Sequence, residues 1–160
     1  MRSRSAVVQV GYLVADVERA AREWHAILGA GPFILMPGVH LEYLHRGKPA
    51  TVAASGALGQ AGQLQIELIQ QNSPGPSLYR DAIPEGAEGL HHMAIIVGDL
   101  DAEVRRMEAL GITTAAWIEY GGMRVAHMDT VSHLGFMIEL IEESGASDAL
   151  FEMTRTAVAD

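Results

Sequence analysis

The run Val8-Gln-Val-Gly-Tyr-Leu-Val-Ala-Asp16 recurs later in the chain as His91-His-Met-Ala-Ile-Ile-Val-Gly-Asp99. Each run is apolar and strand-like, and it leads through a small residue and an aspartate into an amphipathic segment. Gln9 and His92 are 83 positions apart, and the two aspartates share that spacing. Such a repeat predicts two copies of one unit that together build a single core.

A second match lies near the end of each copy. Ile66-Glu-Leu-Ile69 is identical to Ile138-Glu-Leu-Ile141, at a spacing of 72 positions. The two spacings differ by 11, so the first copy carries about 11 extra residues. We place them in the glycine- and proline-containing stretch 37–62.

Each copy reads as βαβββ. Asp16 and Asp99 are suitable helix N-caps, because their side chains can accept hydrogen bonds from backbone amides of the next turn. The apolar residues that follow recur at helical spacing until Gly29 and Gly111. The other strand-like runs lie at 33–36, 41–44, 51–57 and 63–70 in the first copy and at 113–119, 123–128 and 136–141 in the second.

These elements predict one α+β domain over residues 1–160. Its modules span 7–70 and 90–142, joined by a proline-containing linker at 71–89, and a tail at 143–160 has helical character. At 49% hydrophobic and 19% charged residues, the chain has a globular composition.

Composition also excludes several function classes. The chain has no cysteine, which rules out disulfides, thiolate metal sites and cysteine nucleophiles. Its net charge of −9 without a basic cluster argues against nucleic acid and anionic membranes as partners. No apolar run is long enough to span a bilayer, so we expect a cytoplasmic protein.

Polar residues occupy equivalent strand positions in the two copies. Gln9 and His92 lie on the first strands, and Glu67 and Glu139 alternate with apolar neighbours on the last strands. Such glutamates can simply face solvent on half-buried strands. If the first and last strands of each copy are neighbours, however, all four side chains point into one concavity, where they would suit a divalent metal ion.

The strand–Asp–helix pattern around Asp16, the run Gly89-Leu-His-His-Met-Ala94 and the two Ile-Glu-Leu-Ile runs resemble the vicinal oxygen chelate superfamily, the glyoxalase/bleomycin-resistance/dioxygenase group. The resemblance implies paired βαβββ modules that curl into a funnel-like mixed sheet. It also implies a metal site made of Gln9, Glu67, His92 and Glu139. This ligand set looks like that of eukaryotic-type glyoxalase I, and a methylmalonyl-CoA epimerase site is similar.

The resemblance implies a metal-dependent isomerase, epimerase or lyase acting on a small carbonyl compound. One divalent ion (Zn, Ni, Co or Mn) would stabilise the enolate, and Glu139 or Glu67 would be the base, Glu139 being favoured by the resemblance. A different class is a metal-free drug-sequestering protein of the bleomycin-resistance type, which has no need of two carboxylates and His92. A ring-cleaving dioxygenase is disfavoured, because Gln9 stands where it needs a second histidine.

Other polar residues are weaker candidates. We expect Tyr43, Arg124 and His133 to contact substrate, and His91, by strand alternation, to lie on the face opposite His92 as a packing residue. The linker residue Tyr79 reads as part of a surface turn. The edges of the paired modules lack gatekeeper charges, and family members are mostly dimers, so we expect a two-fold homodimer.

Overall fold

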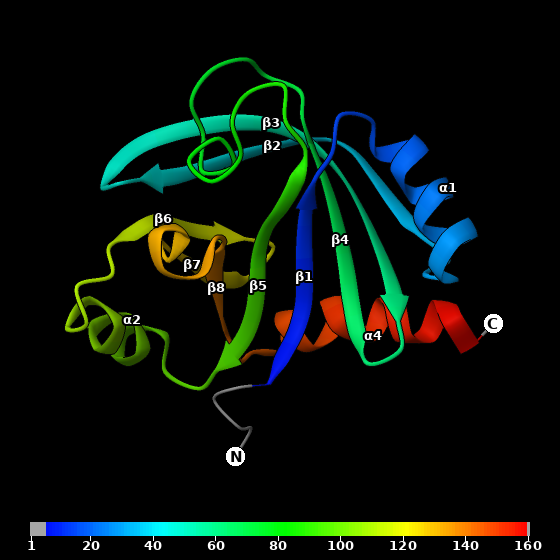
Figure 1. The fold of residues 1–160 in the computed structure, drawn as a ribbon. Coiled ribbons are helices and arrows are strands. Elements are labelled where there is room, and N and C mark those ends of the chain that lie inside the picture. Colours follow the sequence, from blue (N-terminus) through cyan, green and yellow to red (C-terminus); the bar gives the residue numbers. More distant parts are fainter. Residues whose placement is uncertain (1–5, 160) are drawn as a thin grey trace.

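The computed structural model describes residues 6–159, and it contains the two expected βαβββ modules (Figure 1). The first comprises β1 (Val7–Leu13), α1 (Val17–Leu28), β2 (Ile34–His45), β3 (Lys48–Ala61) and β4 (Leu64–Gln71). The second comprises β5 (Gly89–Val97), α2 (Leu100–Glu108), β6 (Thr114–Tyr120), β7 (Met123–Met128) and β8 (Met137–Glu142). A one-turn helix, α3 (Val131–Leu134), precedes β8, and the tail forms the helix α4 (Gly145–Ala159).

The strands form one closed barrel in the order β1-β4-β3-β2-β6-β7-β8-β5. Within each module the first strand runs parallel to the last, β1 beside β4 and β5 beside β8. The modules join through antiparallel pairs, β1 with β5 and β2 with β6. The prediction of a curved mixed α+β sheet is therefore confirmed, and the strands that carry the candidate ligands are neighbours.

Both helices begin as the sequence predicts. Asp16 accepts a hydrogen bond from the backbone amide of Arg19, and Asp99 accepts one from Ala102, each at 2.9 Å. One apolar cluster lies beneath α1 and another beneath α2, so each helix buries its apolar stripe against its own module. A third cluster lies within the barrel and includes Phe151 of α4.

The extra residues of the first module lengthen its hairpin. β2 and β3 span 12 and 14 residues, whereas β6 and β7 span 7 and 6. We expected separate strands at 33–36 and 41–44, but β2 is continuous, with a register shift between Met36 and Val39. Pro37 has no amide hydrogen to donate and Gly38 adopts a positive φ of 66°, so the strand bulges there without ending.

Among the described residues, no helix is both long and apolar enough to cross a bilayer.

Candidate metal centre

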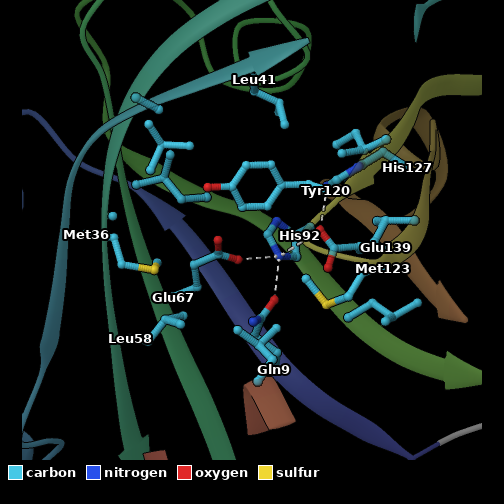
Figure 2. Close-up of a pocket in the computed structure, with 18 of the residues that line it drawn as sticks. Gln9, Met36, Leu41, Leu58, Glu67, His92, Tyr120, Met123, His127 and Glu139 are labelled. Atoms are coloured by element: carbon cyan, nitrogen blue, oxygen red, sulfur yellow. Dashed lines mark hydrogen bonds and ion pairs between the residues drawn. The ribbon is translucent and has the colours of Figure 1, made fainter. Parts of the chain in front are cut away.

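Four side chains from the four central strands meet inside the barrel. The Nε2 atom of His92 on β5 lies 3.0 Å from Oε1 of Gln9 on β1, 3.4 Å from Oε2 of Glu67 on β4 and 3.5 Å from Oε2 of Glu139 on β8. Figure 2 shows the two glutamates on either side of His92. The structure thus brings together all four residues that the repeat singled out.

A hydrogen-bond relay from α4 fixes the orientation of Gln9. The carbonyl oxygen of Leu150 can only accept, so the side-chain group that Gln65 presents to it is the Nε2 donor, at 3.0 Å. The oxygen of Gln65 then accepts from Nε2 of Gln9 at 2.7 Å. This leaves Oε1 of Gln9 facing His92. Thr154 of α4 also accepts from Gln65, at 3.1 Å.

A second relay fixes the protons of His92. The carbonyl of Leu78 accepts from Nε2–H of His91 at 2.9 Å, so Nδ1 of a neutral His91 carries a lone pair. That lone pair accepts from Nδ1–H of His92 at 3.0 Å. The other ring nitrogen of His92, Nε2, is consequently bare in the neutral ring. Histidines that bind a metal through one ring nitrogen typically donate a hydrogen bond from the other, as His92 does to His91.

In the neutral ring, Nε2 therefore faces three oxygen atoms, and this arrangement calls for a cation at Nε2, either a proton or a metal ion. An ion held at about 2.1 Å by each donor would place neighbouring donors about 3.0–3.4 Å apart. The observed separations of 3.0–3.5 Å match this spacing. One imidazole, one amide oxygen and two carboxylates therefore fit a divalent ion.

The two carboxylates have different surroundings. Oε2 of Glu139 lies 2.7 Å from Nε2 of His127, whose N–H can donate to it. Burial alone would raise the pKa of Glu139, but the positive charge that His92 and His127 can carry outweighs burial and lowers it to about 2. The Glu67 side chain is 25% exposed, against 11% for Glu139, and its described partner is His92. Glu67 is therefore the less constrained of the two.

The four side chains line an apolar cavity of about 180 Å³. Its polar lining also includes Ser55, Tyr79, Tyr120 and His127. The rest of its wall comes from both modules and is mostly aliphatic: Met36, Val39, Leu41, Ala54, Gly56, Leu58, Ile69, Ile118, Met123, Val125, Ile141 and Leu150.

The three predicted substrate contacts do not line this cavity. Tyr43 is buried in the core, where its hydroxyl accepts from the amide of Leu78 at 3.1 Å. Arg124 lies outside the barrel and binds Asp101 and Glu142. His133 is exposed on α3. These three residues therefore lie outside this cavity. Local sequence does not distinguish a cavity wall from a core or surface position.

His91 corrects the alternation argument. The β1–β5 register changes from Gly11–His92 to Tyr12–Leu90, so His91 is the extra residue of a β-bulge. Its ring bonds to that of His92 instead of lying on the opposite face. Tyr79 also differs from expectation, because it lines the cavity and contacts the His91 ring edge-on.

Sequence reasoning missed His127. It lies on β7 directly opposite Glu139 in the β7–β8 register, and it is 3% exposed. Within residues 6–159, its Nδ1 atom is the buried side-chain nitrogen that has no hydrogen-bond partner. Pairing the predicted strand 123–128 with the strand that carries Glu139 would have found this residue.

We expect the affinity for a divalent ion to fall as the pH is lowered through the pKa of His92. Burial alone would lower this pKa, but Glu139 and Glu67 outweigh burial and hold it above 6.5. Below the shifted pKa a proton occupies Nε2, so each ion bound must displace it. Calorimetric titration with Ni²⁺ near pH 6 and near pH 8, in buffers of different ionisation enthalpy, measures affinity and proton release. Equal affinity and no proton release at both values would contradict this assignment.

The comparisons with known proteins show the family and the fold. Residues 8–127 match the family model of the Glyoxalase/Bleomycin resistance protein/Dioxygenase superfamily. The sequence has no match among curated proteins.

Solved structures share the fold at low identity. Methylmalonyl-CoA epimerase from Mycobacterium tuberculosis is 24% identical, with 93% of this chain and 97% of that one covered and a TM-score of 0.61. A hypothetical protein from Bacillus halodurans is 20% identical, with 87% and 94% covered and a TM-score of 0.63. A Streptomyces coelicolor methylmalonyl-CoA epimerase variant is 16% identical, with 89% and 100% covered and a TM-score of 0.53. The matched family model extends over most of the chain, and the protein therefore belongs to the Glyoxalase/Bleomycin resistance protein/Dioxygenase superfamily.

Proposed function

We propose that the protein is a metal-dependent isomerase, epimerase or lyase that removes a proton next to the carbonyl of a small molecule. One observation carries this proposal: two carboxylates and an amide oxygen converge on the bare Nε2 of His92 within an apolar cavity. A cavity that only sequesters an apolar ligand has no use for these groups, because burying carboxylates is costly.

Gln9, Glu67, His92 and Glu139 would hold the ion, which could be Zn, Ni, Co or Mn. When bound, a divalent ion supplies positive charge that polarises a carbonyl and stabilises an enolate. The aliphatic wall excludes water, which strengthens electrostatic interactions within the cavity. The relays through Gln65 and His91 keep the donor atoms in place while a substrate enters.

We assign the base role to the two glutamates. Both are close enough to His92 to flank a substrate carbon held beside it. The hydrogen bond from His127 makes Glu139 a weaker base, whereas Glu67 lacks this contact. This contrast favours Glu67 for proton removal, and the family resemblance favours Glu139.

Structural neighbours support the class of reaction. They include methylmalonyl-CoA epimerases, one of them in complex with methylmalonyl-CoA. The stereocentre of methylmalonyl-CoA lies next to its thioester carbonyl, so its inversion can proceed by the proton transfer proposed here.

Glutamine variants separate the base from a mere ligand. Glu67→Gln and Glu139→Gln each keep an oxygen that can coordinate, so we expect both to retain metal while the variant of the base loses about 100-fold or more in rate. The measurement is solvent deuterium incorporation next to the substrate carbonyl, with metal content determined on the same samples. Glu143→Gln, outside the cavity, is the matched control.

Two outcomes would contradict the proposal. If both variants exchange the proton at the wild-type rate, neither glutamate is the base. If purified protein binds no divalent ion yet holds an apolar ligand tightly, the sequestering function replaces the enzymatic one.

We further propose that the chain forms a two-fold homodimer, as the family resemblance implies. The barrel closes within one chain, so the cavity itself needs no second subunit. As a two-fold dimer, the protein should give twice the chain mass of 17.2 kDa in light scattering at micromolar concentration. A mass equal to one chain would refute the dimer.

A further inference from the structure

The cavity wall carries an unusual balance of charge. Its carboxylates in the described part of the chain are Glu67 and Glu139, and its imidazoles are His92 and His127, all grouped at the candidate metal centre. Most of the remaining wall is aliphatic and includes Met36, Leu41 and Met123, which surround the centre in Figure 2. No lysine or arginine among residues 6–159 lines the cavity.

Two arginines of the strands around the cavity are already engaged elsewhere. Arg46 lies 3.1 Å from Asp81 and 2.7 Å from Asp129, which fastens the β2–β3 turn to the linker and to the end of β7. Arg124 lies outside the barrel, 3.1 Å from Glu142 and 3.2 Å from Asp101. Both guanidinium groups already serve carboxylates, so neither offers a free positive charge to a ligand.

These observations bear on the ligand that the cavity can take. Proteins bind phosphate and carboxylate groups with arginine, lysine or helix N-termini, because buried anions need a charged partner. A coenzyme A thioester carries several phosphates, which would have to lie at or beyond the mouth of a cavity of about 180 Å³, on a chain of net charge −9. A hydrocarbon body, in contrast, gains free energy from every part of this wall that it covers.

We infer that the substrate is an uncharged carbonyl compound with a hydrocarbon body and not a phosphate-bearing acyl thioester. The inference rests on the proposed function, because the carbonyl is placed at the candidate metal centre. It separates this chain from its epimerase neighbours, one of which binds methylmalonyl-CoA. The cavity wall would select this substrate in two ways: it contacts the hydrocarbon body of the substrate, and it offers no partner to an anionic group.

A matched pair of ligands tests the inference without catalysis. The 2-methylhexanoyl thioesters of pantetheine and of coenzyme A share the acyl group and the thiol arm, but only the second carries phosphates. Titration calorimetry on metal-free protein should give the pantetheine ester an affinity equal to or higher than that of the coenzyme A ester. A coenzyme A ester that binds about tenfold more tightly, with an affinity that falls as salt is added, would overturn the inference.

A wall variant locates the ligand. Met123→Arg places a guanidinium against the cavity and should weaken the pantetheine ester about tenfold. Met153→Arg is the matched control, because Met153 lies on α4 outside the cavity and is 37% exposed. Unchanged binding by Met123→Arg, or no binding of the pantetheine ester to wild-type protein, would also overturn the inference.

The same ligand distinguishes the two proposals. If the pantetheine ester binds but Zn²⁺-loaded protein exchanges no proton next to its carbonyl, the proposed function fails and the substrate class stands. If exchange occurs only with the coenzyme A ester, the function stands and the substrate class fails.

Discussion

Replacing Gly11 by alanine is expected to abolish metal binding, although Gly11 is not a ligand. Gly11 lies opposite His92 in the β1–β5 register, and the imidazole packs over its Cα. A Cβ at position 11 would lie 2.6 Å from both ring nitrogens of His92. The ring would have to move away from Gln9 and the glutamates, because the strand backbone is fixed by pairing on both sides. Metal content and a Ni²⁺ titration measure the loss.

Two controls separate this steric effect from general destabilisation. Gly98→Ala also adds one methyl group, but nothing lies within 4 Å of its Cβ, so metal binding should be retained. Overpacking typically costs about 1–3 kcal/mol of folding free energy. In a His92→Ala background the added methyl group has room. The loss of folding free energy caused by Gly11→Ala should therefore largely disappear. Equal costs in both backgrounds would show that the clash with His92 is not its cause.

His92→Ala alone is expected to lose metal and activity together. His92 is 1% exposed, and its Nε2 atom is the point to which the three oxygens are directed. Mutating an outer partner of a ligand commonly costs about 10–100-fold in affinity, so we expect removal of the ligand itself to cost about 100-fold or more. The thermal shift that Zn²⁺ gives the wild-type protein should vanish in the variant. His133→Ala, at an exposed position, is the matched control.

If the His92→Ala variant still bound the ion tightly, the ion would have to bind at another place. His91, His92 and His127 also bring ligand atoms within 4.8 Å of one another. If His127→Ala, and not His92→Ala, loses the ion, the histidine cluster would be the binding site and the assignment made here would be wrong.

Much of the fold follows from local sequence, because the duplication shows the same signals twice. Asp16 and Asp99 cap their helices as predicted, and the period-two pattern places Glu67 and Glu139 on the faces that point inward. Gln9 and His92 join them because β1 and β5 lie beside β4 and β8. Repeat spacing and alternation together were therefore enough to identify the four central side chains.

The positions of the residues around these four side chains depend on strand-pairing registers that the sequence does not reveal. His91 turns toward His92 because one residue bulges out of the β1–β5 pairing, and His127 meets Glu139 only through the β7–β8 register. Alternation equally suits Tyr43 in a cavity wall or in the core, and the structure places it in the core. These positions are determined by pairing between strands that are far apart in the sequence, so a local sequence pattern cannot predict them.

The position of Glu67 and Glu139 on either side of His92 has a stereochemical consequence (Figure 2). A trigonal carbon held between them presents one prochiral face to each carboxylate. If one glutamate removes the proton and the other returns it, the centre is inverted; if a single glutamate does both, configuration is retained. Under the proposed function, the pseudo-symmetry left by duplication would provide an acceptor for each face, while His127 makes the two unequal. Chiral analysis of a turned-over substrate would show which face exchanges first.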